Sequence, residues 1–295
     1  MIAAFHHSQF EAVALLERKT TTVTVVLPSR EVASTITPIV DALLGLGGLV
    51  DQVLVVDAAS EDGTADAARR AGAEVVQENE LLPDFGPVVG KGDAMWRALD
   101  AVRGEVVAYL DADTQDFSPH FATGLVGPLL TRPELQFVKG GFRRPYTAPG
   151  GTELPGEGGR VTELCARPLL SAFYPELAGF RQPLAGEIAA RRPLFEAIPF
   201  ATGYAIETQM LLDVHAEVGL GAMAEVDLEE RRNTHQPLSK LGPMAYSVLL
   251  AVHERLRRDG RLLDGPPPPF RTGAGDTVDV VCVERPPLAS LRAPA

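Results

Sequence analysis

The alternation of strand and helix patterns in the first quarter of the chain restricts its fold more than any other feature. Residues 20–27, TTTVTVVL, are rich in β-branched residues and end at a proline, as a buried strand does. Helical spacing of apolar residues follows at 35–46, a second strand at 50–57 and a third at 74–77. This order predicts an α/β fold with a mostly parallel, doubly wound sheet and helices on both faces.

The remaining patterns extend this order to the end of the chain. An amphipathic pattern at 1–19 predicts a lead-in helix, and the dense Pro and Gly of 145–160 predict a mobile, functional loop. After a Pro-rich linker, alternation at 277–284 predicts an edge strand or a packing segment. We expect one large domain made of a lead-in at 1–19, two halves at 20–141 and 142–262, and a tail at 263–295. Further strands are predicted at 135–141 and 222–228, and further helices at 93–102, 118–130, 161–173, 188–192, 205–213 and 243–258.

Charge and composition argue against several classes of protein. The 295 residues are 45% apolar and 22% charged, as is common in soluble globular proteins. Lys and Arg number 27 and Asp and Glu 39, so the net charge is −12, and we expect neither nucleic acid nor an anionic membrane as a partner. No apolar run approaches a membrane span, and Cys165 and Cys282 are far apart without a C-x-x-C partner. These features predict a soluble protein of the reducing cytoplasm.

A short apolar run at 105–110 ends in Asp111-Ala112-Asp113, which is the first candidate for a site. In an extended chain, two side chains separated by one residue point the same way, about 6–7 Å apart. Two carboxylates at the carboxyl edge of a parallel sheet suit Mg²⁺ or Mn²⁺ that bridges to a diphosphate. The alternative is that the aspartates only cap the next helix.

Lys91 is the second candidate and lies between Gly90 and Gly92, just before a predicted helix. The glycines let a ligand approach the backbone closely, and a Lys at the start of a helix suits phosphate. The segment is not a P-loop, because its spacing differs and Asp93 stands where Ser or Thr would be. Lys91 and the two aspartates together predict a site for a cation and a diphosphate.

Arg160 follows two glycines at the start of another predicted helix. Backbone N–H groups, the guanidinium and the Thr162 hydroxyl would together suit a small phosphorylated anion. An ordinary Gly-rich helix start with a solvated Arg is the competing interpretation.

Histidines and one glutamate complete the set of candidates. Glu207 lies in the first turn of a predicted helix, where a carboxylate also serves as a simple partner of the helix dipole. His235 lies in a polar loop and is a candidate third metal ligand. His6 and His7 are adjacent and could bind a metal, although a surface or packing role is the more common one.

Several motifs resemble those of the nucleotide-sugar glycosyltransferases of the GT-A fold, and four others resemble the glucosyl-3-phosphoglycerate synthases among them. The resemblance spans about residues 5–255. It implies a Rossmann-like sheet whose half at 20–141 binds the nucleotide sugar and whose half at 142–262 binds the acceptor, in a homodimer. The first set is Leu27-Pro28-Ser29, Asp57-x-x-Ser60-x-Asp62-Gly63-Thr64, Gly90-Lys91-Gly92 and Asp111-Ala112-Asp113; the second is GGRVTELCARPLL at 158–170, QPLAGE at 182–187, GYAIET at 203–208 and PLSKLGPM at 237–244.

This resemblance implies a metal-dependent retaining glycosyltransferase. It would move glucose from a nucleoside diphosphate, UDP-glucose in first place, to the C2 hydroxyl of D-3-phosphoglycerate. Glu207 would contact the transferred sugar, and the Leu184 carbonyl would lie beside the anomeric carbon. The other implied roles are nucleotide binding by Pro28, Ser29, Arg30, Ser60 and Lys91, ribose, diphosphate and metal binding by Asp111, Ala112 and Asp113, a diphosphate-side contact by Arg231, and acceptor binding by Gly159, Arg160 and Thr162.

The chain departs from the family pattern at two places. Val32 stands where the family has an acidic contact, which leaves the nucleotide base open. The metal-binding His of the family aligns with Asn233, so we expect His235 to be the third ligand and Asn233 a poorer oxygen ligand near the acceptor. Transfer of mannose from GDP-mannose, as in a mannosyl-3-phosphoglycerate synthase, is the first alternative. A non-catalytic binder of nucleotide sugars is the second, and a dehydrogenase is disfavoured because G-x-G-x-x-G is absent.

Overall fold

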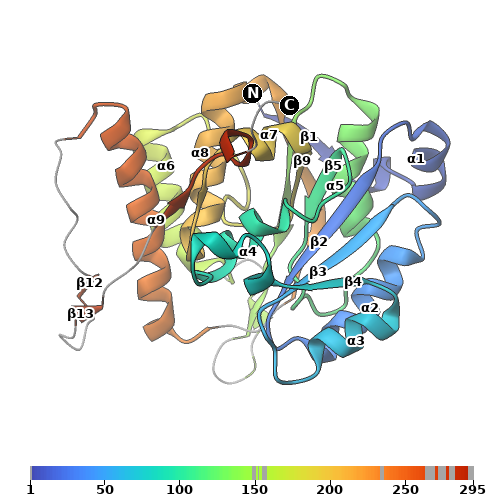
Figure 1. Cartoon of the computed structure of the whole chain (residues 1–295). Coiled ribbons are helices and arrows are strands. Elements are labelled where there is room, and N and C mark those ends of the chain that lie inside the picture. The colour runs from blue at the N-terminus through green and yellow to red at the C-terminus, as the bar shows by residue number, and fades with distance from the viewer. Residues whose placement is uncertain are drawn as a thin grey trace.

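The computed structural model describes residues 2–147, 151, 153–154, 158–232, 236–262, 270–271, 277–278 and 283–291. Its centre is an eight-stranded sheet in the order β1-β11-β6-β9-β5-β2-β3-β4 (Figure 1). All neighbouring strands are parallel except β9, which runs antiparallel to β5 and β6. The predicted mostly parallel α/β sheet is therefore confirmed. The strands are β1 (Ala3–His6), β2 (Val23–Ser29), β3 (Gln52–Asp57), β4 (Glu74–Gln77), β5 (Val106–Tyr109), β6 (Phe137–Arg143), β9 (Ile188–Arg191) and β11 (Met223–Glu230).

Helices cover both faces of this sheet (Figure 1). They do so because buried apolar side chains of the strands point alternately to its two faces. Along β3, Val53 and Val55 belong to one hydrophobic cluster, with α2 and α5, whereas Leu54 and Val56 belong to a second cluster, with α4 and α8. A strand that is buried on both sides reads as a continuous apolar run, as β3 does. The helices are α1 (Ala12–Arg18), α2 (Ala33–Leu44), α3 (Thr64–Ala71), α4 (Gly90–Ala98), α5 (His120–Thr131), a π-helical turn at Thr162–Ala166 that continues into α6 (Arg167–Phe173), α7 (Arg192–Ala197), α8 (Ile206–Val218) and α9 (Leu238–Arg258).

One predicted helix and part of another are strands in the structure. Residues 3–6 of the expected lead-in helix form β1, which pairs with β11 at the edge of the sheet, and helix α1 begins only at Ala12. The segment expected as a helix at 188–192 is β9, whose residues Ile188 to Ala190 are buried between β5 and β6. Alanine favours helices locally, but backbone pairing inside a sheet outweighs that small preference.

The tail does not extend the main sheet. The described part of 277–284 consists of β13 (Thr277–Val278), paired with β12 (Phe270–Arg271), and the start of β14 (Glu284–Arg285), paired with β10 (Phe200–Ala201). Arg285 donates to both carboxylate oxygens of Asp93 at 2.9 and 2.8 Å, and Trp96 Nε1 donates to the Pro286 carbonyl at 2.9 Å. The described residues 284–286 thus form a packing segment over α4. Much of the predicted loop at 145–160 lies outside the described residues, which include its short hairpin β7 (Tyr146–Thr147) and β8 (Glu153–Leu154).

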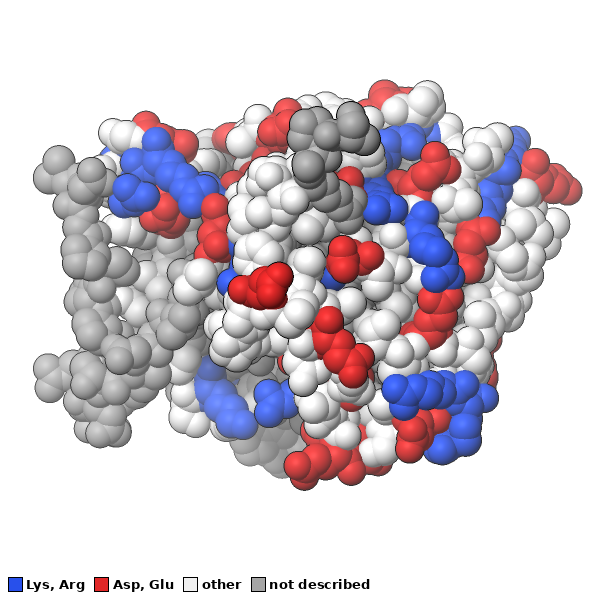
Figure 2. All heavy atoms as spheres, in the orientation of Figure 1, with Lys and Arg blue, Asp and Glu red and all other residues white. Residues whose placement is uncertain are grey.

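The surface carries both signs of charge close together. Figure 2 shows acidic and basic side chains interspersed over one face of the molecule, with no extended basic area among the described residues of that face. Within the described part of the chain, no helix has the length and apolar character needed to cross a membrane.

Candidate active site

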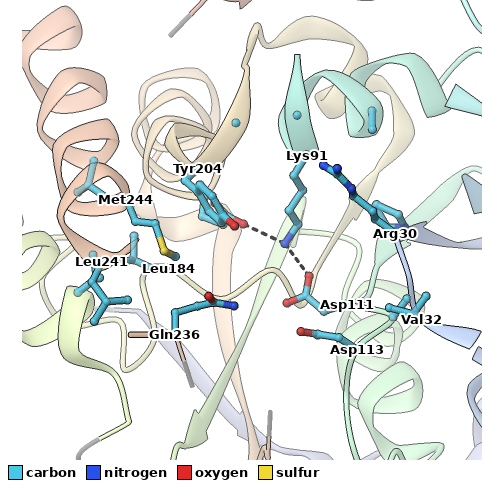
Figure 3. A pocket seen from close by; sticks show the side chains of 18 of the residues that line it. Arg30, Val32, Lys91, Asp111, Asp113, Leu184, Tyr204, Gln236, Leu241 and Met244 are labelled. Atoms are coloured by element: carbon cyan, nitrogen blue, oxygen red, sulfur yellow. Dashed lines mark hydrogen bonds and ion pairs between the residues drawn. The ribbon is translucent and has the colours of Figure 1, made fainter. Parts of the chain in front are cut away.

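A cavity of about 580 Å³ opens at the carboxyl edge of the sheet, beyond the ends of β2, β5 and β11. Figure 3 shows Arg30 and Val32 on one side of it and Leu241 and Met244 of α9 on the other, with Lys91, Asp111 and Asp113 between them. Residues from both halves of the chain therefore face one space. The predicted site residues that line it are Pro28, Ser29, Arg30, Lys91, Asp111, Ala112, Asp113, Gly159, Arg160, Thr162, Leu184, Glu207 and Arg231.

The two aspartates converge through a turn and not through strand alternation. Strand β5 ends at Tyr109, and Ala112 and Asp113 already lie in a turn, so the extended geometry assumed from the sequence is wrong. The turn is held by Thr35, whose hydroxyl donates to the Ala112 carbonyl at 2.6 Å. Arg231 Nη2 nevertheless lies 3.0 Å from Asp111 Oδ2 and 2.8 Å from Asp113 Oδ1. Both carboxylates thus serve one site.

Lys91 joins this site from the first turn of α4. Its Nζ donates to Asp111 Oδ1 at 2.5 Å (Figure 3). It also donates to Glu207 Oε1, in the first turn of α8, at 3.0 Å. Burial disfavours the charged amine, but the Asp111 and Glu207 carboxylates outweigh it and raise the pKa of Lys91. Burial likewise opposes ionisation of Asp111, yet Lys91 and Arg231 hold the pKa of its carboxyl well below the ordinary value. The pair is therefore ionised at neutral pH.

Arg231 is a deeply buried cation of the site. It follows β11 and is 3% exposed, and its Nε lies 2.9 Å from Glu187 Oε1. One guanidinium is thus shared among three carboxylates, those of Asp111, Asp113 and Glu187. Burial raises the pKa of Glu187, because this shared cation compensates its charge only in part.

Arg160 lies at the second end of the cavity, beside the π-helical turn. Its Nη2 donates to the Gln236 carbonyl at 2.7 Å, and its guanidinium lies over the Tyr146 ring, 5.2 Å from the centroid. Among the described residues, its buried Nε has no hydrogen-bond partner. Because Arg160 lines the cavity, its guanidinium is suited to an anionic ligand, as predicted for the acceptor end.

Ser60 is the described candidate that does not line the cavity. Its hydroxyl accepts from the backbone N–H of Glu31 at 3.0 Å, and Glu31 has a left-handed backbone with φ of 53°. Ser60 therefore supports the loop that carries Arg30 and Val32. Asn233 and His235 lie outside the described residues, so the choice between them as third metal ligand stays a prediction.

Sequence reasoning missed several residues of the site. The sequence shows Glu187 only as part of the motif QPLAGE, because a glutamate that follows a tight segment carries no local sign of burial or of a partner. Lys139 of β6 is fully buried and donates to the Ala185 carbonyl at 2.8 Å, and burial lowers its pKa to about 8. Other lining residues without an assigned role are Arg144, Tyr204, Gln236, Leu241 and Met244.

Gly186 permits the close approach of Lys91 and Asp111. A Cβ at this position would lie 2.5 Å from both Asp111 Oδ1 and Lys91 Nζ. We expect Gly186→Ala to push this ion pair apart and lower catalytic turnover about 10- to 100-fold, because small misplacements of reacting groups are that costly. Steady-state kinetics with a thermal unfolding control measures this. Gly221→Ala, whose Cβ meets open space, is the matched control, and equal kinetics of the two variants would refute a functional role of the pair.

Comparison with known proteins relates the whole chain to one group of enzymes. Residues 24–171 match the family model of glycosyl transferase family 2. The glucosyl-3-phosphoglycerate synthases of Petrotoga mobilis and Mycolicibacterium smegmatis are 39% and 42% identical, over 88% and 79% of this chain and 82% and 77% of their own length.

Solved structures extend the similarity to the fold. The mannosyl-3-phosphoglycerate synthase from Rubrobacter xylanophilus has a TM-score of 0.89 and 48% identity over 98% of this chain and 97% of its own. The glucosyl-3-phosphoglycerate synthase from Mycobacterium tuberculosis, in complex with Mn²⁺, UDP-glucose and phosphoglyceric acid, has a TM-score of 0.86 and 38% identity over 99% of each chain. These matches confirm the GT-A type of fold.

Proposed function

The chain belongs to the glucosyl-3-phosphoglycerate synthases of glycosyl transferase family 2 and is a metal-dependent glycosyltransferase, and on this premise we propose the reaction that its cavity performs. The reaction is transfer of a hexose from a nucleoside diphosphate to the C2 hydroxyl of D-3-phosphoglycerate, with retention at the anomeric carbon. Glucose from UDP-glucose is the first choice, since the similar enzyme of M. tuberculosis binds UDP-glucose and phosphoglyceric acid.

One observation carries this proposal: two separate groups of charged side chains face one cavity. Asp111, Asp113 and Lys91 form the first group, and Arg160 the second. A donor diphosphate needs both a cation site and direct cationic contacts, whereas 3-phosphoglycerate needs a guanidinium that can donate hydrogen bonds to its phosphate or carboxylate. A single-substrate hydrolase would not need the second group.

The aspartates fit a divalent cation of the kind that the relatives hold, Mn²⁺ or Mg²⁺. Both offer hard carboxylate oxygens, and the Asp113 side chain is 56% exposed at the cavity. Asp111 and Asp113, with His235 as the third ligand, would hold it. When bound, such a cation stabilises negative charge on a departing diphosphate.

The side chains around the transferred sugar favour front-face substitution. The C2 oxygen of the acceptor bonds to the anomeric carbon, the bond from that carbon to the diphosphate breaks, and the hydroxyl proton passes to the departing diphosphate oxygen. Lys91 holds the diphosphate, while Glu207 and the Leu184 carbonyl position the sugar. A double displacement would need a carboxylate nucleophile beneath the anomeric carbon, whereas the resemblance assigns Glu207 to binding of the sugar.

Two parts of the donor molecule have more than one candidate: the sugar and the nucleotide base. Similarity to the mannosyl-3-phosphoglycerate synthase of R. xylanophilus favours GDP-mannose as a second candidate. Val32 lines the donor side of the cavity and offers no acidic contact to a base.

The test is a donor panel: purified chain, 3-phosphoglycerate and Mg²⁺ with UDP-glucose, GDP-glucose and GDP-mannose in separate reactions. We expect the highest kcat/KM with UDP-glucose; a preference for GDP-mannose would support the alternative, and donor binding without product would support a non-catalytic binder.

Arg160→Ala should raise the KM for 3-phosphoglycerate about 10- to 100-fold, because a hydrogen bond to a charged group contributes about 1.5–3 kcal/mol. The KM for the sugar nucleotide should change little. Steady-state kinetics with each substrate varied in turn measures both. Arg181→Ala is the matched control, since Arg181 is a half-exposed Arg paired with Asp227 outside the cavity. If Arg160→Ala changed only the KM of the donor, the acceptor site would be assigned wrongly.

The assembly of the chain rests on the resemblance, and its location rests on the cysteine and hydropathy patterns of the sequence. A homodimer in the cytoplasm is the corresponding proposal, and light scattering of the purified chain tests its first part. A mass of one chain at micromolar concentration would contradict the dimer.

A further inference from the structure

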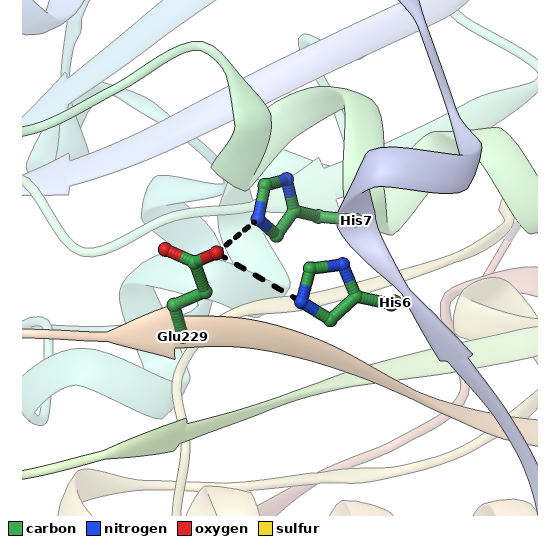
Figure 4. Close-up of side chains that lie close together, drawn as sticks. All are labelled: His6, His7 and Glu229. Atoms are coloured by element: carbon green, nitrogen blue, oxygen red, sulfur yellow. Dashed lines mark ion pairs between the residues drawn. The ribbon is translucent and has the colours of Figure 1, made fainter.

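A second group of potential metal ligands lies outside the active-site cavity. His6, His7 and Glu229 each offer one ligand atom, and these three atoms lie within 4.8 Å of one another (Figure 4). Glu229 Oε1 is 3.1 Å from His7 Nε2 and 3.8 Å from His6 Nε2. Ligands about 2.0–2.1 Å from a tetrahedral Zn²⁺ lie roughly 3.3 Å apart, so only a small contraction separates this group from a metal site.

The backbone is shaped to bring these side chains together. Adjacent residues of a strand point to opposite faces, but β1 ends at His6 and His7 begins a 3-10 turn, so both rings lie side by side with centroids 4.5 Å apart. On β11 the pairing with β6 shifts between Asp227 and Glu230, and Glu229 has a left-handed φ of 65°. Such a conformation is unfavourable for a non-Gly residue and recurs at functional sites.

Neighbouring groups orient the two imidazoles. The Nδ1 of His6 accepts from the Ser8 backbone N–H at 3.3 Å and lies 2.8 Å from the Ser8 hydroxyl, so the ring is held with Nε2 toward Glu229. The His7 ring packs at a tilt against the His120 ring with centroids 4.2 Å apart, while His120 Nε2 lies 3.2 Å from the Leu228 carbonyl. The buried Nε2 of His7 has the Glu229 carboxylate as its ion-pair partner at 3.1 Å. The Glu229 side chain is 55% exposed, so water can complete the coordination.

We propose that His6, His7 and Glu229 form a second metal site, separate from the diphosphate-binding aspartates, that takes a nitrogen-preferring divalent ion such as Zn²⁺. Two imidazoles and one carboxylate suit Zn²⁺ and disfavour Mg²⁺, which prefers oxygen ligands. The site joins β1 to the end of β11, two residues before Arg231. Bound Zn²⁺ therefore fastens the edge strand to the segment that enters the active site and stabilises the folded chain.

Equilibrium dialysis of the untagged full chain against Zn²⁺ tests this proposal. Excess Mg²⁺ is added to compete for the carboxylates of Asp111 and Asp113, while the imidazoles of His6 and His7 stay available to Zn²⁺. We expect about one bound Zn²⁺ and a higher Tm for the native chain. Affinity should fall at least about tenfold in Glu229→Gln and His7→Ala, since even outer-shell partners of a metal contribute roughly that much.

His215→Ala is the matched control, because His215 also lies 3.8 Å from a carboxylate, that of Glu176, but belongs to no group of metal ligands among the described residues. It should bind Zn²⁺ as the native chain does. Glu229→Gln preserves side-chain shape and decides the question if His7→Ala does not fold. Equal Zn²⁺ affinity of the native chain and Glu229→Gln, or no retained Zn²⁺ in the native chain, would overturn the site.

Discussion

Replacing Asp113 with alanine should lower sugar transfer about 10²- to 10³-fold, the range found when one group that stabilises developing charge is removed. The variant should remain folded, because the Asp113 side chain is 56% exposed and lies in a turn at the rim of the cavity. Its carboxylate is the more accessible of the two that Arg231 contacts, and it is the one placed to share a cation with the donor. Kinetics with saturating donor and acceptor measures the rate of sugar transfer, and thermal unfolding shows whether the variant is folded.

Asp66→Ala is the matched control for this variant. Asp66 is also an exposed aspartate paired with one arginine, Arg69, but lies on α3 away from the cavity. It should retain the native rate. Near-normal, metal-dependent turnover of Asp113→Ala would show that this carboxylate does not bind the leaving group.

Arg231→Ala should destabilise the chain by about 3–5 kcal/mol, the usual cost of removing one partner from a buried ion pair. Arg231 is 3% exposed, and without it the carboxylate of Glu187, which is 1% exposed, loses the guanidinium that lies 2.9 Å away. Asp111 would retain Lys91, so Glu187 carries most of the cost. Urea unfolding of native and variant chains gives the difference in free energy of unfolding.

The effect of Arg231→Ala should also depend on pH. Burial raises the pKa of Glu187 in the folded chain above its unfolded value, and removal of the guanidinium raises it further. The folded variant therefore binds a proton more tightly than the unfolded chain does, so its stability is greatest at low pH and falls as the pH rises through the folded pKa. We expect a smaller deficit at about pH 5 than at about pH 8.

Arg232→Ala controls for the loss of an arginine at the same strand end. Arg232 is 44% exposed and pairs with Glu153 and Glu230 at the surface, where ion pairs contribute little. Its stability should stay near the native value. Equal stability of Arg231→Ala and Arg232→Ala would contradict the account of Arg231 as the shared cation of the site.

The parts of the site that local chemistry determines could be predicted from the sequence. Asp111, Lys91 and Arg160 each stand at the end of a strand or the start of a helix, and parallel strands gather such positions at one edge. Their meeting in one cavity follows from strand order. The anion role of Arg160 is predicted from its glycines and stays a prediction, although the residue does line the cavity.

The parts that depend on distant contacts could not be predicted. Strand β9 has a helix-favouring sequence and becomes a strand only because β5 and β6 both pair with it. Glu187 gains its importance from Arg231, 44 positions later, and nothing in its local sequence indicates that partner. The same holds for His6, His7 and Glu229, which the pairing of β1 with β11 brings together.

The most direct test of the central claim is the identification of the product by NMR. Purified chain, Mg²⁺, 3-phosphoglycerate and the preferred sugar nucleotide should give one new phosphorylated glycoside. The account predicts that its sugar is joined to the C2 oxygen with the α configuration and that it fails to form when 3-phosphoglycerate is omitted. Release of nucleoside diphosphate without an acceptor-dependent glycoside, or a product of β configuration, would contradict it.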